Sequence, residues 1–540
     1  MKIKNMIKLS KIKTINWLKK NNVQIILFLI ILLGAYLRLN DFSNLARFNA
    51  DQVRDAKIVD AMFEGEEFPL LGPKAGGTAF KLGPAFYYLE YFSGAIFGST
   101  PGGIALFIPI FSIASIFLFY LFFKNIFSTK ITLALTLLYA SSFYLIKYSR
   151  FAWNPNAIPF FLFAFLNLSL AILLSKRPLY YHITLAAVVA IGIQLHTTLL
   201  ILLPIFTFGL YTYLIIKNKK VPLIKICAVL FTIAFLNVPF FLNDIKKDGE
   251  NLRNFFSGAA SKTESSTAII SNIKNSFNFL AQGTAYSLTG LEPQKNWSKP
   301  VKLLQSGNIT EIAAAFLAIL ITFFGIFLAV LKIKNEKTQS RKTALYFIAS
   351  ISIISLLLFT ALGDELNIRF FIVIIFLPFM FLGFSLEYLS NYFKDKSFRL
   401  AIIIITILLL TFTSLNIAKY VQVYDLETSQ KNTSAYGGIS VGESRGISEY
   451  IKETLENYPD SKPYTFPFEF KRSLDYFNSK SGISVHSFSA NNLADKSILF
   501  LVAEKESAEK SLDKLNGQFD VLEQKNIGRF TIFKLLPKYQ

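Results

Sequence analysis

The chain of 540 residues has little charge, one cysteine and three histidines. Charged residues make up 17% of it and hydrophobic residues 53%, whereas soluble proteins carry about 25% charged residues. The single cysteine, Cys227, excludes an internal disulfide and any metal site built from several cysteines. His182, His196 and His486 are too far apart in sequence to form a zinc-binding motif. This composition is typical of a membrane protein.

Long apolar runs dominate residues 23–420. A membrane-spanning helix needs roughly 17–25 apolar residues, and about eleven runs are long enough. The predicted spans are Val23–Leu37, Ile104–Phe123, Ile131–Ile146, Ile158–Leu174, Ile183–Leu195, Leu199–Ile216, Ile224–Leu242, Ile312–Leu331, Ala344–Leu362, Phe370–Leu386 and Leu400–Ile417. No internal repeat indicates a transporter built from duplicated halves.

The net charge of +21 does not indicate a nucleic-acid-binding protein, because its distribution follows a membrane topology. Residues 425–540 carry 16 acidic and 15 basic residues, so the positive excess lies in residues 1–424, mostly in short connections between spans. Such connections are cytoplasmic by the positive-inside rule. The N-terminus is therefore predicted to be cytoplasmic, and an odd number of spans puts the C-terminal segment outside.

These features predict a polytopic all-α protein of the cell membrane, with about 11 transmembrane helices and a small extracytoplasmic C-terminal α/β domain. The predicted parts are a basic N-terminus at 1–22, a multi-span domain at 23–420 with outer loops at 38–101 and 243–310, and a C-terminal domain at 425–540. In that last domain, Gly446–Tyr458 has helical spacing of apolar residues, and Ser497–Ala503 and Phe530–Leu535 read as strands.

An acidic segment, F-N-A-D-Q-V-R-D, follows the first span directly. Asp51 and Asp55 are four residues apart, so they share one face of the helix predicted at about Asp51–Glu64. A carboxylate beside the membrane can act as a general base on an acceptor hydroxyl, provided that it reaches the proton. The alternative is an interfacial helix whose acidic side is simply solvated.

Three basic residues come just outside predicted spans on the same side of the membrane: Lys81, Arg150 and Arg369. An anionic phosphate leaving group needs such cations, and arginine can bind it with two parallel hydrogen bonds. The alternative for each is an interfacial anchor that reaches lipid headgroups.

Polar and aromatic residues accompany Arg150 in the motif Y-S-R-F-A-W-N-P-N. Trp153 can stack on a sugar ring, and Asn154 can hydrogen-bond sugar hydroxyls, although tryptophan at this depth is also a common membrane anchor. His196, between two spans, is a candidate acid/base or phosphate ligand. The alternative for His196 is a satisfied polar residue at a helix turn.

Several short motifs, in this order, resemble the GT-C superfamily of polyprenyl-phosphate-sugar glycosyltransferases, and in particular the protein O-mannosyltransferase and lipid A aminoarabinose transferase group. The resemblance covers residues 20–420. The motifs are L-R-L at Leu37–Leu39, the acidic segment at Asp51, the Gly/Pro segment Leu71–Leu89, Tyr148–Asn156, Gln194–His196 and Asn237–Ile245.

This resemblance implies that Asp51 is the catalytic base and that one sugar moves from a polyprenyl-phosphate donor to an acceptor on the outer face, usually with inversion. The acceptor is a lipid, a glycan or a protein. The family often has Asp-Glu where this chain has Asp51-Gln52. No metal ligand is therefore assigned, no cofactor is certain, and a divalent cation is left open, as is the part played by Asp55.

Two other functions are compatible with the sequence. A flippase or transporter of polyprenyl-linked lipids often has ionisable residues in mid-span, and the charges here gather at span ends. A non-catalytic membrane scaffold would carry the acids and cations incidentally. Transfer of a sugar that depends on Asp51 separates the enzyme from both alternatives.

Overall fold

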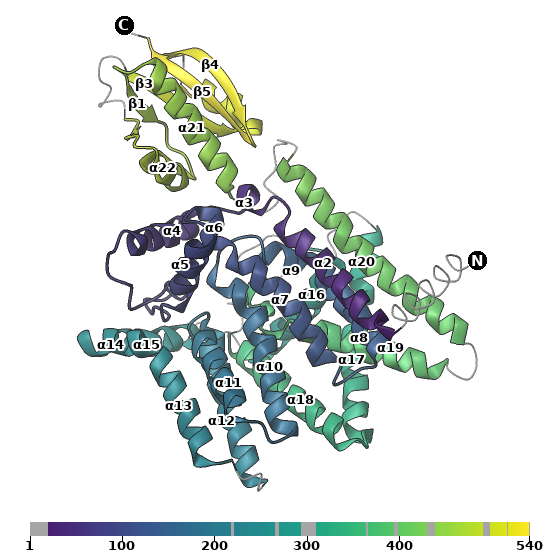
Figure 1. Ribbon diagram of the computed structural model, residues 1–540. Coiled ribbons are helices and arrows are strands. Elements are labelled where there is room, and N and C mark those ends of the chain that lie inside the picture. Colours follow the sequence, from purple (N-terminus) through teal and green to yellow (C-terminus); the bar gives the residue numbers. More distant parts are fainter. Residues whose placement is uncertain are drawn as a thin grey trace, which may run out of the picture.

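The computed structural model describes residues 20–217, 221–264, 269–292, 309–362, 366–393, 398–428, 438–489, 497–515 and 517–538. Most of the basic N-terminus, 1–19, lies outside the described residues, as do 218–220 of the basic connection after the sixth predicted span. The described chain is a large helical bundle with a small sheet-containing domain at one end (Figure 1).

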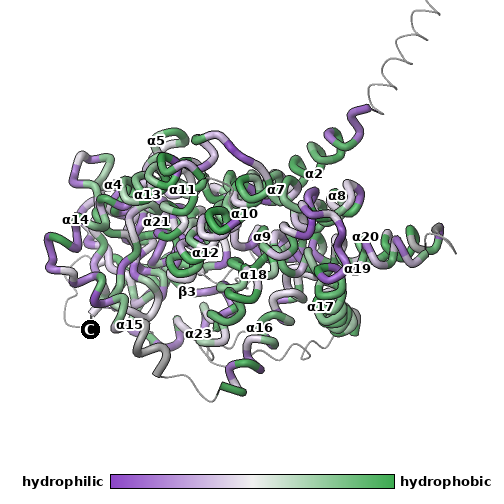
Figure 2. The backbone as a smooth tube through the Cα atoms, turned by 90° about the horizontal axis from the view of Figure 1, so that it is seen from below, coloured by the Kyte–Doolittle hydropathy of each residue, from purple (hydrophilic) through white to green (hydrophobic). Residues whose placement is uncertain are grey.

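Seven described helical segments are long and apolar enough to cross a membrane. They are α2 (Asn22–Leu39), α6 with α7 (Pro101–Ala105, Phe107–Phe123), η1 with α10 (Asn154–Ala157, Ile158–Leu174), α12 (Thr197–Ile216), α17 (Ile309–Asn335), α18 (Gln339–Leu362) and α20 (Phe398–Thr428). Hydrophobic residues predominate along these helices (Figure 2). A polytopic helical membrane protein is thereby confirmed.

The predicted number of eleven spans is not confirmed, although each predicted run is helical. Two runs are helix pairs bent by 58° and 59°, and counting each pair as one span gives nine. The pairs are α13 with α14 (Leu223–Leu236, Val238–Lys246) and η3 with α19 (Ile368–Ile374, Phe376–Tyr392). The other two runs form shorter helices: α8 with α9 (Thr129–Ser141, Phe143–Tyr148) and α11 (Leu179–Gly192).

The break between α8 and α9 has a physical cause at Ser142. Its ψ of 116° is not helical, and its hydroxyl donates to the Ser287 carbonyl at 2.7 Å. The amide of Phe143, which lacks its helical partner, donates to Asn416 Oδ1 at 2.7 Å. A backbone carbonyl of α16 (Ile269–Thr289) and the Asn416 side chain of α20 thus satisfy the polar groups of the broken turn inside the bundle.

The predicted outer loop at 243–310 is helical over most of its described part. α14 ends at Lys246 and is followed by α15 (Glu250–Glu264) and α16 (Ile269–Thr289). Its remaining residues include 265–268 and 293–308, which lie outside the described residues. Phe279 of α16 packs against Phe359 and Phe371 at centroid distances of 5.3 and 5.5 Å. Packing against the bundle outweighs the loop-like Ser, Asn and Gly content.

The predicted C-terminal α/β domain is confirmed. Its sheet has the order β2-β1-β3-β5-β4, with β1 parallel to β2 and β3, and β5 antiparallel to β3 and β4. The strands are β1 (Lys462–Thr465), β2 (His486–Ser487), β3 (Ser497–Glu504), β4 (Phe519–Ile527) and β5 (Phe530–Pro537). α21 (Val441–Asn457) and α22 (Lys471–Lys480) share one apolar core with the sheet, and α23 (Ala508–Asp513) shares another.

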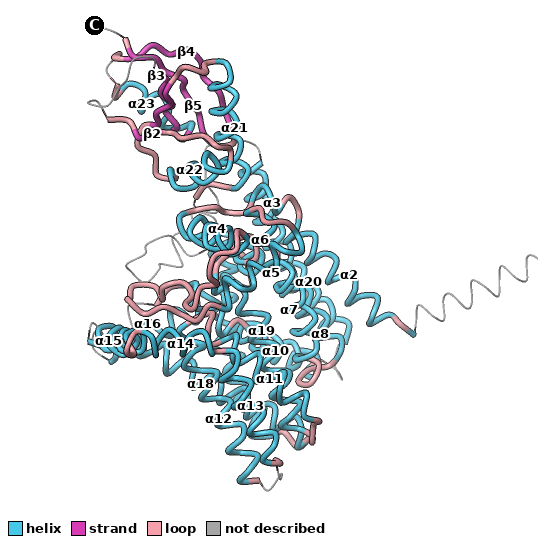
Figure 3. The backbone as a smooth tube through the Cα atoms, turned by 60° about the vertical axis from the view of Figure 1, so that its left-hand side comes forward, coloured by secondary structure: helices cyan, strands magenta, loops and turns pink. Residues whose placement is uncertain are grey.

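Three helices from the first predicted outer loop lie between the bundle and the C-terminal domain (Figures 1 and 3). α3 (Phe42–Leu45) and α4 (Ala50–Phe63) contact the C-terminal helices, and α5 (Ala85–Phe97) packs on α4. The helices predicted at Asp51–Glu64 and Ala85–Phe97 are therefore present.

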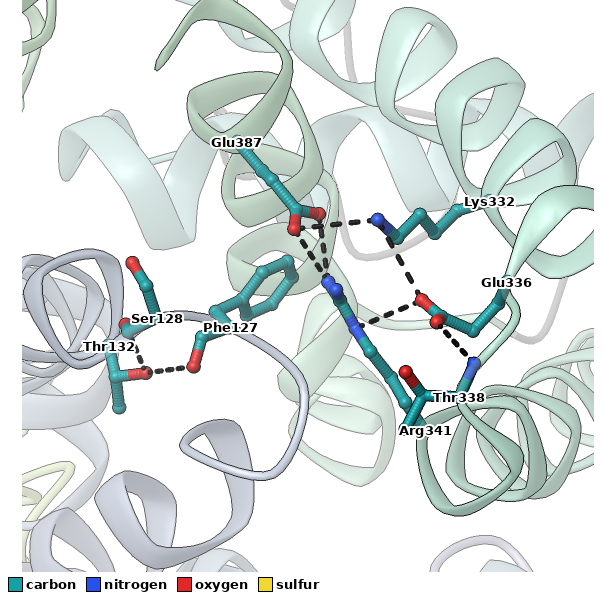
Figure 4. A network of polar contacts seen from close by, with 8 residues as sticks. All are labelled: Phe127, Ser128, Thr132, Lys332, Glu336, Thr338, Arg341 and Glu387. Carbon is teal, nitrogen blue, oxygen red and sulfur yellow. Dashed lines mark hydrogen bonds and ion pairs between the residues drawn. The ribbon is translucent and has the colours of Figure 1, made fainter. Parts of the chain in front are cut away.

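A cluster of paired charges ties α17 and α18 to α19, and we call it the Glu387 cluster (Figure 4). Arg341 Nη2 lies 2.7 and 2.9 Å from the two carboxylate oxygens of Glu387. Arg341 Nε lies 3.4 Å from Glu336, and Lys332 Nζ lies 3.5 Å from Glu387 and 3.7 Å from Glu336. The Thr338 amide also donates to Glu336, at 3.0 Å.

Candidate active site

Asp51 lies in the first turn of α4, with its side chain 56% exposed. The helix begins there because Asn49 and Gln52 form a capping box, in which the Asn49 amide donates to Gln52 Oε1 at 3.1 Å. Gln52 Nε2 also donates to the Ala152 carbonyl at 2.8 Å. The start of α4 is thereby joined to the segment that contains Trp153.

Arg54 is placed between two carboxylates of α4. Its Nη1 lies 3.0 Å from Asp51 Oδ1, and its Nη2 lies 2.7 Å from Asp55 Oδ1. Asp51 faces solvent, whereas Asp55 is only 1% exposed. Of the two predicted catalytic carboxylates, Asp51 is therefore the one that an acceptor can reach.

A second buried acid, Glu90 of α5, lies near Asp55. Neither carboxylate oxygen of Glu90, nor Asp55 Oδ2, has a hydrogen-bond partner among the described residues. Burial raises the pKa of Asp55 to about 7, although Arg54 opposes this rise. Burial and the charge of Asp55 raise the pKa of Glu90 well above its ordinary value. Burial, followed by the charge of Asp55, also raises the pKa of Tyr87.

Two further arginines interact electrostatically with the Asp51 carboxylate, Arg47 and Arg369. The Arg47 guanidinium lies 5.3 Å from the ring centre of Phe151, and that of Arg369 lies 5.4 Å from Trp153 and 5.1 Å from Phe370. Burial lowers the pKa of Arg47, and Asp51 counteracts it. The aromatic faces hold these cations in place. We call Arg47, Asp51, Arg54, Asp55 and Arg369 the Asp51 cluster.

The Gly/Pro segment forms a hairpin beside Arg369. The Ala75 amide donates to Phe80, and the Leu82 amide donates to Pro73, at 2.9 and 3.0 Å. A Cβ on Gly76 would lie 3.4 Å from Arg369 Nη2, so the guanidinium lies close to the backbone of this hairpin.

A model of the family described as dolichyl-phosphate-mannose-protein mannosyltransferase matches residues 81–242. In the solved structures, ArnT from Cupriavidus metallidurans bound to undecaprenyl phosphate has a TM-score of 0.54 at 10% identity, over 95% of this chain and 98% of that chain. The Archaeoglobus fulgidus oligosaccharyltransferase in the apo form has a TM-score of 0.50 at 11% identity, over 91% and 70%. No curated protein sequence matches the chain. The chain has the GT-C glycosyltransferase fold.

Within this GT-C fold, the family match includes five of the predicted site residues but no member of the Asp51 cluster. Residues 81–242 include Lys81, Arg150, Trp153, Asn154 and His196. The match does not extend to Asp51, Asp55 or Arg369. The fold comparison with ArnT covers 95% of this chain.

The GT-C fold brings some predicted donor-binding residues together. Trp153 and Arg369 are in contact, and the His196 ring lies 5.3 Å from that of Phe370, the residue after Arg369. His196 also caps α12, because its Nδ1 accepts from the Thr198 amide at 3.2 Å. Lys81 is exposed, and its backbone is fixed on both sides by the Asn251 side chain at 2.9 Å.

Two predicted residues bind the backbone instead of facing the Asp51 cluster. Arg150 is 2% exposed, and its Nη2 donates to the Asn40 carbonyl at 2.8 Å while Nη1 donates to the carbonyls of Leu37 and Arg38. Asn154 Nδ2 donates to the Leu195 carbonyl at 2.6 Å. Both side chains therefore hold the polypeptide at the end of α2 and before α12.

Sequence reasoning did not assign Arg47, Arg54, Tyr87 or Glu90 to the site. Arg54 had a usable signal, because residues three apart on a helix are neighbours and Arg54 follows Asp51 by three. No pattern in the sequence connects Arg47 or Glu90 with Asp51. Within the described residues, no group of three or more His, Cys, Asp or Glu side chains is arranged to hold a metal ion.

Proposed function

We propose that this protein transfers a single sugar from a polyprenyl-phosphate donor to an acceptor hydroxyl at the outer face of the membrane, with inversion. The observation that carries the proposal is the Asp51 cluster, in which one exposed carboxylate pairs with Arg54 at 3.0 Å and interacts electrostatically with the guanidinium groups of Arg47 and Arg369. A base for the acceptor and cations for an anionic leaving group are thus present in one place.

In the proposed reaction, Asp51 takes the proton from the acceptor hydroxyl as that oxygen bonds to the anomeric carbon of the sugar. The bond from this carbon to the donor phosphate breaks on the opposite face, and its electron pair leaves with polyprenyl phosphate. The guanidinium groups of Arg47 and Arg369 stabilise the phosphate charge that develops. Asp55 is buried behind Arg54, so we assign it to holding Arg54 rather than to touching the substrate.

The matching family and fold support this reaction class, because both are those of glycosyltransferases. The related ArnT structure contains undecaprenyl phosphate, in agreement with a lipid-linked donor. Lys81, Trp153 and His196 are further candidates for donor binding in the proposal. Lys81 is exposed, Trp153 contacts Arg369, and His196 packs against the neighbouring Phe370.

An internal contact supports the proposed orientation. Residues 46–48, which follow α2, pair with residues 439–441, which follow α20. Both segments must therefore lie on the same side of the membrane, so the chain crosses it an even number of times between them. With α2 as the first span, the total is odd, in agreement with a cytoplasmic N-terminus and an extracytoplasmic C-terminal domain.

To test the proposal, membranes that contain the protein are incubated with a panel of radiolabelled polyprenyl-phosphate sugars, beginning with mannose. We expect label to leave one donor with the wild type, and Asp51→Asn to lower the rate by about 10²–10⁴-fold. Its stability should change by no more than about 0.5 kcal/mol, as for most surface substitutions.

Asp41→Asn is the matched control. Asp41 is another exposed acid of the predicted outer loop 38–101, and asparagine tolerates its φ of 51°. If Asp51→Asn transfers sugar at the same rate as Asp41→Asn, Asp51 has no part in the mechanism. Label that stays on every donor, in membranes that supply lipid, glycan and protein acceptors, would count against transfer itself.

A further inference from the structure

The C-terminal domain pairs with the stretch of chain that leads into α4. The Phe48 amide donates to the Ile439 carbonyl at 2.8 Å, and the Val441 amide donates to the Ala46 carbonyl at 2.9 Å. These bonds flank an antiparallel bridge between Arg47 and Ser440. The chain before Asp51 is therefore one side of a short ladder whose other side belongs to the C-terminal domain.

Phe48 anchors this ladder. It is 2% exposed, and its ring lies 5.2 Å from that of Tyr476 and 5.5 Å from that of Phe477, both on α22. Ser473 of the same helix donates to the Phe48 carbonyl at 2.5 Å. A buried aromatic anchor of this kind resembles the residues that dominate binding at protein interfaces.

Asn49 connects the ladder to the first turn of α4. Its Oδ1 accepts from the Ile439 amide at 3.1 Å, although the two residues are 390 positions apart. The same residue is the N-cap of α4, two positions before Asp51. A Cβ on Gly438 would lie 2.2 Å from Asn49 Oδ1, so only glycine allows this approach.

The Gly438–Ser440 strand is itself held by a buried ion pair. Arg529 is 1% exposed, and its Nε and Nη2 lie 3.0 and 3.1 Å from the two carboxylate oxygens of Glu443. Arg529 also donates to the Gly438 carbonyl. Glu443 in turn accepts from the Ser440 amide at 3.0 Å, within the capping box of α21.

The far end of α4 is attached to the same domain. Lys480, at the end of α22, lies 3.0 Å from the Asp60 carboxylate. α4 is thus held near both ends by one domain, while Gln52 ties its first turn to the bundle. The position of Asp51 relative to Arg369 depends on these attachments.

We propose that the C-terminal domain is a positioning element for Asp51, which it fixes through the Gly438–Ser440 strand and Asn49. Phe48, Asn49 and Gly438 are then positioning residues that do not touch the substrate. This inference rests on the proposed role of Asp51 as the base, and it gives the C-terminal domain a part in the reaction other than binding the acceptor.

Two substitutions of Asn49 separate the interdomain bond from the helix cap. Asn49→Ser keeps an N-cap and retains a capping box with Gln52 in its Ser-x-x-Gln form, but its hydroxyl is too short to reach Ile439. Asn49→Ala removes both the cap and the bond. Arg445→Ala is the control, because it removes a different interdomain bond, the exposed one from Arg445 to Asn44 at 2.7 Å.

The full-length protein in membranes is assayed for kcat and for KM with labelled polyprenyl-phosphate mannose, and for amide hydrogen exchange in residues 47–53. A shift of about 1 Å at a reacting group can cost about 100-fold in rate. We therefore expect Asn49→Ser and Asn49→Ala both to lower kcat by about tenfold or more, with faster exchange and little change in KM. Arg445→Ala should behave as the wild type.

A wild-type kcat for Asn49→Ser beside a lowered one for Asn49→Ala would overturn the inference, because the cap alone would then matter. Unchanged exchange in both variants would overturn it as well. Gly438→Ala, which pushes the strand away from Asn49, provides a second variant and should act in the same direction. Full turnover by Asp51→Asn would refute the proposed function instead, and the exchange data would still report whether the domain holds α4.

Discussion

The Asp51 cluster and the Glu387 cluster both gather acids and cations where helices meet, but only one of them balances its charges. In the Glu387 cluster, Lys332 and Arg341 face Glu336 and Glu387, and each of the four has an oppositely charged partner. In the Asp51 cluster, three arginines lie near two carboxylates, one of which is exposed. The third acid nearby, Glu90, is buried and its pKa is raised, which favours its uncharged form.

The pKa shifts differ in the same way. Burial alone would raise the pKa of Glu336, but the Thr338 amide, Arg341 and Lys332 together lower it. Burial raises the pKa of Asp55 in spite of Arg54. A cluster that joins helices stabilises its own charges, whereas the Asp51 cluster retains uncompensated positive charge and a buried acid with an unpaired oxygen. That imbalance is what an anionic substrate group can relieve.

Removing one guanidinium from the Asp51 cluster should have a large effect on activity. Arg369→Gln leaves Asp51 and Arg54 in place but removes a cation proposed to stabilise the phosphate. Loss of one such donor commonly costs about 10²–10³-fold in kcat, and we expect a loss of this size in the labelled-donor assay. Arg369→Lys should recover part of it, because lysine keeps the charge but not the planar stacking on Trp153.

Arg399→Gln, at an exposed arginine of α20, is the control for this substitution. Its turnover should equal that of the wild type. If Arg369→Gln and Arg399→Gln have the same kcat, the excess charge of the Asp51 cluster has no catalytic role, and the contrast with the Glu387 cluster loses its meaning.

Substitutions in the Glu387 cluster should lower the stability of the protein and leave its turnover unchanged. Arg341→Gln removes hydrogen bonds to Glu387, and bonds to charged groups are worth about 1.5–3 kcal/mol. We expect thermal unfolding in detergent at a lower temperature, with unchanged activity per folded molecule. The double variant with Glu387→Gln should lose less than the sum of the two single losses, because Glu387 is then no longer a carboxylate without its arginine. Lowered turnover in the folded fraction would contradict the structural role.

The sequence predicted much of the fold and less of the site. Apolar runs locate helices because the bilayer imposes their length, so even the short α8 and α11 lie where runs were found. The helix of Asp51 was predictable from its local pattern. The region of α15 and α16 was not, because its Ser, Asn and Gly content resembles a loop and its helices depend on packing against other segments.

The partners of Asp51 were the hardest part to predict, because they come from distant positions. Arg54 follows from helical spacing, but Arg369 reaches Asp51 only through the folding of the whole bundle. Arg150 illustrates the reverse case. Its position just outside a predicted span made it a candidate for binding phosphate, whereas Nη1 and Nη2 donate to the carbonyls of Leu37, Arg38 and Asn40. Whether any of these residues binds the donor stays a prediction.

Substitution of Asp55 should have the smallest effect, a change in how stability depends on pH. The direction of this change follows from the pKa of Asp55. The value rises from an ordinary 3.8 to about 7 in the folded protein. Between these values the folded chain binds more protons than the unfolded chain, so its stability falls as the pH rises from about 4 to about 7. Asp55→Asn cannot ionise and should not lose this stability.

The melting temperature of Asp55→Asn should therefore increase relative to that of the wild type as the pH rises from about 4 to about 7. Both proteins are measured in the same detergent. If the melting temperature of Asp55→Asn instead decreases relative to that of the wild type as the pH rises, pairing with Arg54 outweighs burial in its effect on the pKa of Asp55. The Asp51 cluster would then resemble the Glu387 cluster, in which neighbouring cations already stabilise the carboxylates.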